Sequence, residues 1–118
     1  MLRCQVHQEE KVVSAEALFG FAREALAKLG LPEADAQLGA ECLLWANLRG
    51  VDSHGVNRLL WVVDMAESGQ LNPLPEIRVL RETPAVGLID GDRGFGAVTA
   101  TCEEQGACSG VRGVVMPV

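Results

Sequence analysis

The sequence predicts a mixed α+β fold, in which an N-terminal three-helix segment is followed by short strands and one further helix. Up to residue 69, apolar residues recur at spacings of three and four, the period of a helix with one buried face. After residue 72, prolines and short alternating apolar runs replace this period, as is typical of strands. We therefore divide the chain into a polar leader (1–13), a helical segment (14–72) and the start of an α/β segment (73–118) that we expect to be truncated.

Size and composition exclude several functional classes. The 118 residues suffice for one small domain, and 48% are hydrophobic, which is typical of a folded protein. The formal charge is −6, from 10 Lys and Arg against 16 Asp and Glu. The cations are scattered along the chain, which argues against a nucleic-acid partner. No run of about 18 apolar residues exists, so no membrane partner is expected.

Three helices are predicted in the helical segment. Ser14 is a suitable N-cap for the first helix, which Gly30 ends. Pro32 suits the first turn of the second helix, which runs to about Leu48. The apolar positions expected to face the core are, in the first helix, Leu18, Phe21, Ala22, Ala25, Leu26 and Leu29; in the second, Ala34, Leu38, Cys42 and Trp45; and in the third, Leu59, Val62, Val63 and Ala66.

The segment after residue 72 is predicted to contain strands and one helix. Alternation around Ile77 and Val79 indicates one strand, and residues 85–89 form a second apolar run before an Asp-Gly turn. A helix is expected from Ala97 to about Ser109, followed by a buried strand over 113–118. Such a final strand needs neighbours for its backbone groups. This need is the strongest internal indication that the chain is a fragment or requires a partner.

The four cysteines do not indicate a metal site. They form no C-x-x-C pair and have no close histidine, so neither a zinc site nor a redox dithiol is predicted. Residues 5–11 are polar where a signal peptide would be apolar. We therefore expect a cytoplasmic protein whose cysteines act as small core residues.

His54 is the candidate for acid–base chemistry. It lies between Ser53 and Gly55, in a tight turn over 51–55 before the third helix, whose N-terminal dipole favours a neutral imidazole. A neutral imidazole can accept a proton. The alternatives are a structural histidine and a Ser53 that merely caps the helix.

Arg58 is the candidate for binding an acid group. It follows His54 by four residues, so both side chains can face the same side. Its guanidinium can hold a carboxylate by two parallel hydrogen bonds while the imidazole addresses the neighbouring carbon. Surface ion pairs are the alternatives: Arg58 with Asp64 or Glu67, and Arg49 with Asp52.

The glycine-rich stretch D-G-D-R-G-F-G over 90–96 does not match a dinucleotide fingerprint. The position three beyond Gly96 is Thr99 rather than glycine, and the ending of a P-loop is absent. A loop whose glycines adopt positive φ is the preferred interpretation.

Four segments together resemble the malate/L-lactate dehydrogenase family, which also includes ureidoglycolate and sulfolactate dehydrogenases and the piperideine- and pyrroline-2-carboxylate reductases. They are N-L-R-G-V-D-S-H-G-V-N-R-L over 47–59, G-x-L-N-P over 69–73, D-G-x-x-G-x-G over 90–96 and G-V-x-G-V-V over 110–115. The resemblance covers residues 14–118, and its S-H-G-V-x-R core is specific.

The resemblance implies an oxidoreductase with a non-Rossmann fold that uses NAD or NADP and interconverts 2-hydroxy acids and 2-oxo acids. Ser53 and His54 would belong to the proton relay, and Arg58 would bind the substrate carboxylate. No cofactor-binding residue is assigned, no metal is expected, and the full-length form is expected to be a homodimer.

Two departures from the family pattern shape the functional prediction. Val62 stands where the family often has tyrosine. Family members are about three times as long, and their remaining part holds an Asn-Ser-x-His segment and most cofactor contacts; the aspartate that completes the relay in some members is also missing from this chain. We expect an N-terminal portion of a dehydrogenase that is inactive alone. The alternatives are a catalytically silent helical interaction module and a fragment of a cyclic imino acid reductase.

Overall fold

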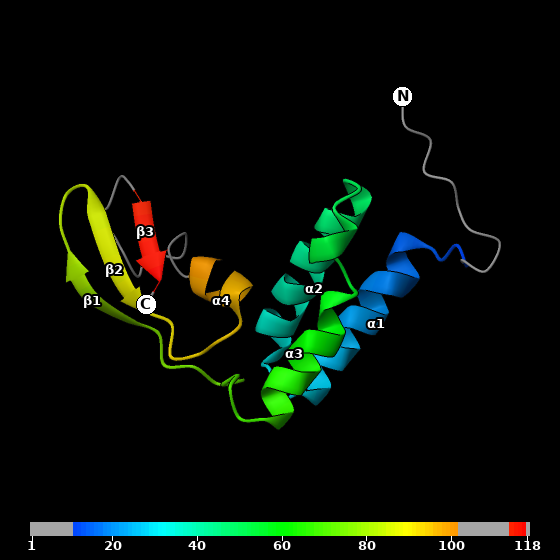
Figure 1. Cartoon of the computed structure of the whole chain (residues 1–118), viewed down its shortest axis with the longest axis horizontal. Coiled ribbons are helices and arrows are strands. Elements are labelled where there is room, and N and C mark those ends of the chain that lie inside the picture. Colours follow the sequence, from blue (N-terminus) through cyan, green and yellow to red (C-terminus); the bar gives the residue numbers. More distant parts are fainter. Residues whose placement is uncertain (1–10, 102–113, 118) are drawn as a thin grey trace.

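A computed structural model describes residues 11–101 and 114–117 (Figure 1). The predicted mixed α+β class is confirmed: three helices pack together at one end, a small sheet lies at the other, and a short helix lies between them. In chain order the elements are α1 (Ala15–Lys28), α2 (Glu33–Leu48), the 3-10 turn η1 (Asp52–His54), α3 (Arg58–Glu67), β1 (Arg78–Glu82), β2 (Val86–Asp90), α4 (Gly96–Thr101) and β3 (Val114–Pro117).

The first helix begins and ends as predicted. The Ser14 hydroxyl accepts a hydrogen bond from the Ala17 amide at 3.1 Å, which satisfies one of the free amides of the first turn. Gly30 follows the helix with a φ of 100°, a conformation that glycine adopts without steric cost. The buried core joins all three helices and consists of Ala22, Leu26, Leu31, Ala36, Ala40, Leu43, Leu59, Val62 and Leu71.

The buried face of α2 is not the predicted one. Its buried positions are small or aliphatic, whereas Trp45 is 57% exposed and Cys42 is also exposed. Close packing explains the difference, because a Cβ at Gly39 would approach both Leu26 and Phe95 to 2.8 Å. Small residues let α1 come near, so the larger apolar residues turn outward. The prediction of a core cysteine is wrong for Cys42, and the other cysteines lie outside the described residues.

The three strands form one sheet in the order β1-β2-β3. The strands β1 and β2 pair antiparallel with an irregularity between Val79 and Arg81, and β2 pairs parallel with β3. The final strand therefore has β2 as its neighbour on one side. The helix expected over 97–109 is seen as α4 up to Thr101, and the rest lies outside the described residues.

Two loops join the helical end to the sheet. The Asn72 side-chain amide donates to Asp92 Oδ2 at 2.8 Å, its backbone amide donates to the Arg93 carbonyl at 2.9 Å, and Arg93 Nη1 donates to the Gly69 carbonyl at 3.2 Å. Residues 69–73 and 90–96, two of the segments that carry the family resemblance, are thus in direct contact. These bonds fix the loop before α4 against the end of α3.

The glycine-rich loop differs from the prediction in its backbone. Its positive φ angles belong to Asp92 (48°) and Arg93 (57°), not to its glycines. A Cβ at Gly94 would come within 2.6 Å of Pro75, so this glycine is required by close approach instead. None of the helices among the described residues is long and apolar enough to cross a bilayer.

Candidate functional site

The candidate residues Ser53 and His54 lie in the 3-10 turn η1, between α2 and α3. Backbone hydrogen bonds close this turn, from the His54 amide to the Val51 carbonyl at 3.0 Å and from the Gly55 amide to the Asp52 carbonyl at 3.1 Å. The turn therefore has a defined backbone although both side chains are exposed.

Asn47, in the last turn of α2, holds this turn from both sides. Its Nδ2 donates to Asp52 Oδ1 at 2.8 Å, and its Oδ1 accepts the Val56 amide at 2.8 Å. Gly55 is buried against the Asn47 amide, where a Cβ would overlap the side chain. Asn47 is not among the site residues predicted from the sequence. The sequence pattern that could have identified it is a side-chain amide, which can both donate and accept hydrogen bonds, at the end of a predicted helix and just before a tight turn.

The structure links Ser53, His54 and Arg58. Ser53 Oγ lies 2.9 Å from His54 Nδ1, and Arg58 Nε donates to the Ser53 carbonyl at 2.8 Å. His54 and Arg58 are not on one helix, as the four-residue spacing suggested, because α3 begins only at Arg58. Ser53 does not cap α3, since Asn57 directly precedes that helix.

The Ser53–His54 hydrogen bond involves the Nδ1 atom of the imidazole. When Nδ1 carries the proton and donates to Ser53 Oγ, Nε2 has a free lone pair and can accept a proton from a substrate hydroxyl. When both nitrogens are protonated, Nε2 can return that proton. The same pair can therefore act in both directions of a reaction.

The end of the Arg58 guanidinium is available to an anion. Nε is used by the Ser53 carbonyl, whereas Nη1 and Nη2 have no hydrogen-bond or ion-pair partner among the described residues. The alternative pairings with Asp64 and Glu67 are not formed. Two parallel N–H groups at the tip of a positioned guanidinium suit a carboxylate.

The predicted Arg49–Asp52 ion pair is also absent from the described part of the chain. Asp52 accepts from Asn47, and the Arg49 guanidinium stacks 3.8 Å from the centroid of the Trp45 ring. A tight turn at Gly50 (φ 75°) separates the two residues. Asp52 thus supports η1 through the neutral amide rather than through a cation.

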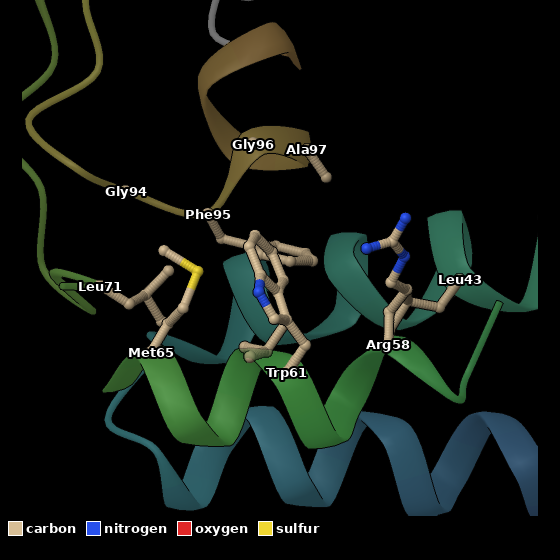
Figure 2. A pocket seen from close by; sticks show the side chains of 10 residues that line it. Leu43, Arg58, Trp61, Met65, Leu71, Gly94, Phe95, Gly96 and Ala97 are labelled. Carbon is tan, nitrogen blue, oxygen red and sulfur yellow. The ribbon is translucent and has the colours of Figure 1, made fainter. Parts of the chain in front are cut away.

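Arg58 lies at one end of a cavity of about 290 Å³ between α3, α2 and the loop before α4 (Figure 2). In Figure 2 Trp61 and Phe95 lie at its centre, and Met65 and Leu71 lie at the end away from Arg58. The lining residues are Leu43, Arg58, Trp61, Val62, Met65, Leu71, Gly94, Phe95, Gly96 and Ala97.

A cradle for the phosphates of a dinucleotide needs free backbone amides or clustered cations. In the glycine-rich loop the Asp92 amide donates to Asp90 Oδ1 and the Gly94 amide donates to the Gly91 carbonyl, so these donors are already satisfied. No group of three or more metal-ligating side chains occurs within residues 11–101 and 114–117.

Comparison with known proteins identifies related sequences. The family model for malate/L-lactate dehydrogenase matches residues 13–113. A malate dehydrogenase of Pyrococcus horikoshii is 52% identical over 86 residues, which are 73% of this chain and 24% of that protein. An L-sulfolactate dehydrogenase of Methanocaldococcus jannaschii is 40% identical over 75 residues, 64% of this chain and 22% of that protein.

Solved structures agree with the sequence comparison. The malate dehydrogenase structure from Pyrococcus horikoshii superposes with a TM-score of 0.81 and 45% identity, covering 87% of this chain and 30% of that one. The sulfolactate dehydrogenase structure from Methanocaldococcus jannaschii gives a TM-score of 0.76 at 33% identity, covering 80% of this chain and 28% of that one. The chain spans about a quarter of the length of the curated relatives it matches.

Proposed function

The chain belongs to the malate/L-lactate dehydrogenase family, and on that premise we propose that it supplies the proton-transfer and carboxylate-binding part of an oxidoreductase that interconverts 2-hydroxy and 2-oxo acids. One observation carries the proposal: Arg58 is hydrogen-bonded to the Ser53 carbonyl, while the Ser53 hydroxyl is hydrogen-bonded to His54. An anion-binding group and a proton-transfer group are therefore linked through one residue.

Arg58 binds and orients the acid. Its Nη1 and Nη2, which have no partner among the described residues, hold the substrate carboxylate, and its bond to the Ser53 carbonyl limits rotation of the guanidinium. The carbon next to the carboxylate carries the hydroxyl or oxo group, so fixing the acid group also directs the reacting oxygen. Binding of a small hydroxy or oxo acid follows from this arrangement.

His54 moves the proton on that oxygen. During oxidation Nε2 accepts the hydroxyl proton, and during reduction it returns a proton to the oxo oxygen, while Ser53 holds Nδ1. Bound NAD or NADP supplies the hydride chemistry at the adjacent carbon. Because the chain spans about a quarter of the length of the dehydrogenases it matches, we propose that the 118-residue chain alone does not turn over substrate.

Two further properties belong to the proposal. The first is a reducing cytoplasmic location, in which the cysteines would remain thiols. A homodimeric full-length form is supported by large apolar side chains exposed on the helical segment, Phe21 and Leu48 among them. Size-exclusion chromatography of the full-length form checks the second property.

A chimera tests the function. The 86 residues matched to the Pyrococcus horikoshii malate dehydrogenase replace the corresponding part of that enzyme, and oxidation of NADH and NADPH is followed with oxaloacetate and pyruvate. We expect turnover, a kcat at least about 100-fold lower for His54→Ala, and mainly a higher KM for Arg58→Ala.

The surface variant Gln37→Ala is the matched control, because its side chain bonds only the exposed Glu41 carboxylate. We expect its kinetic constants to equal those of the parent chimera. A folded chimera without turnover would contradict the proposal and favour the silent interaction module. Unchanged kcat in His54→Ala would contradict the role of the imidazole.

A further inference from the structure

The cavity beside Arg58, hereafter the Trp61 pocket, has one charged group and an otherwise apolar lining. Among its ten lining residues, Arg58 is the only cation, and the Trp61 indole is the only other side-chain hydrogen-bond donor. Leu43, Val62 and Leu71 are buried, whereas Trp61 is 54% exposed. The pocket thus combines an anion-binding end with a hydrophobic floor.

We propose that the Trp61 pocket receives the hydrocarbon side chain of the acid whose carboxylate Arg58 holds. The substrate class would then be 2-oxo and 2-hydroxy monocarboxylic acids with an apolar side chain. This inference rests on the proposed function and narrows it. The relatives whose names specify malate and sulfolactate act on acids with a second anionic group, so the inference separates this chain from them.

The lining disfavours a second anionic group at the far end. A carboxylate between Met65, Leu71 and Phe95 would lose part of its hydration, and no lining side chain there offers a cation or a hydroxyl in exchange. A hydrocarbon group in the same place gains free energy because apolar surface leaves water on both sides. The formal charge of −6 also repels a dianion more strongly than a monoanion.

The dimensions suit a small acid. A volume of about 290 Å³ is at the lower end of the range of ligand pockets, which favours a compact molecule. Figure 2 shows Trp61 beside Phe95, so that the two aromatic rings border the space between Arg58 and Met65. A half-exposed indole at this position becomes covered when an apolar group occupies the pocket.

Ligand titration of the 118-residue chain tests the inference. The two tryptophan indole N–H signals are followed by NMR, because Trp61 lines the pocket and Trp45 does not. We expect 2-oxo-4-methylpentanoate to shift the Trp61 signal with a Kd about tenfold lower than that of pyruvate, which has the same charge without the side chain. L-malate should bind more weakly than 2-oxo-4-methylpentanoate, and the Trp45 signal should not follow either titration.

Two lysine variants report on the far end of the pocket. Met65→Lys places a cation there and should reverse the preference toward L-malate. Leu60→Lys is the matched control, because Leu60 is on the same helix, is 77% exposed and does not line the pocket. We expect it to retain the preference of the parent chain, which separates a local effect from the added charge.

The outcomes distinguish this inference from the proposed function. Wild-type binding of L-malate or pyruvate as tight as that of 2-oxo-4-methylpentanoate would overturn the apolar pocket and leave the role of Arg58 intact. If none of the acids gives a saturable shift of the Trp61 signal, the inference is also overturned, because the titrated 118-residue chain contains both the pocket and the Arg58 guanidinium. Turnover of the chimera then decides the function separately. Unchanged binding in Arg58→Ala would contradict the carboxylate role itself.

Discussion

Asn47 Nδ2 donates a hydrogen bond of 2.8 Å to Asp52 Oδ1, and through it the end of α2 holds the turn that carries the candidate proton-transfer residues. The other end of the same amide accepts the Val56 N–H. One side chain therefore spans the turn, and the positions of Ser53 and His54 depend on a residue outside the pair.

Asn47→Ala is expected to destabilise the chain by about 1–3 kcal/mol, because the half-buried Val56 N–H loses its acceptor. Urea unfolding followed by circular dichroism measures the change. Asn47→Asp keeps the acceptor for Val56 but faces Asp52 with a second carboxylate, so it should also destabilise. Adding Asp52→Asn to that variant restores a donor–acceptor pair and should recover stability. Equal stability of Asn47→Ala and the parent would contradict the role of this amide.

Glycines 39 and 20 are expected to respond oppositely to alanine. Gly39→Ala pushes a methyl group against Leu26 and Phe95 and should lower the free energy of unfolding by about 1–3 kcal/mol. In α1, a Cβ at Gly20 would contact none of the described residues outside its own turn of helix within 4 Å, so Gly20→Ala should raise the free energy of unfolding by up to about 1 kcal/mol through helix propensity. Thermal melts of both variants provide the comparison. A stabilising Gly39→Ala would mean that α1 and α2 are less closely packed than described.

Asp92 is expected to contribute to stability in two ways, by accepting hydrogen bonds and by adopting a left-handed backbone conformation, and substitutions can separate the two. Its Oδ2 accepts from Asn72 at 2.8 Å and from the Glu76 amide at 3.0 Å, and its φ of 48° is left-handed. Asp92→Ala removes both hydrogen bonds and places an alanine in the left-handed backbone region, so the free energy of unfolding should fall by about 2–4 kcal/mol. Asp92→Gly relieves the backbone but still loses the bonds, so its stability should lie between those of Asp92→Ala and the parent. Denaturant midpoints that rank the variants otherwise would contradict this division.

The Cys42 thiol is expected to react slowly with alkylating reagents. Partial burial, and next the carboxylate of Glu41, raise the pKa of the Cys42 thiol above its ordinary value. A raised pKa leaves less thiolate at pH 8, and the thiolate is the reacting form. Iodoacetamide labelling in a background with serine at the other three cysteines should be slower than for a free cysteine peptide. Glu41→Gln should accelerate it, and an unchanged rate would contradict the contribution of that carboxylate.

Ser53→Ala is expected to affect chemistry more than binding in the chimera. Without the hydroxyl, His54 Nδ1 loses the partner that orients the ring, and kcat should fall by about tenfold. KM should change little, because the Arg58 bond goes to the backbone carbonyl of residue 53, which remains. Steady-state kinetics separate the two constants, and a larger change in KM than in kcat would contradict the assignment.

The periodicity of the apolar residues and a few short motifs were enough to predict the three N-terminal helices and the candidate site residues. The spacing of apolar residues predicted the three helices, because a 3.6-residue period is a property of the chain segment itself. Ser14 and Gly30 marked the ends of the first helix through local backbone chemistry. The S-H-G-V-x-R motif identified Ser53, His54 and Arg58 as candidates, and the structure links these three residues.

Tertiary structure decided which faces pack and what surrounds the site. The sequence favoured Cys42 and Trp45 for the core, but Gly39 and its small neighbours occupy it, because the distance between helices depends on the partner helix. The same holds for Asn47, whose two hydrogen bonds exist only once the chain has turned back on itself at residues 50–56. The Trp61 pocket likewise needs α3 and the loop before α4, which are brought together by contacts between residues far apart in sequence.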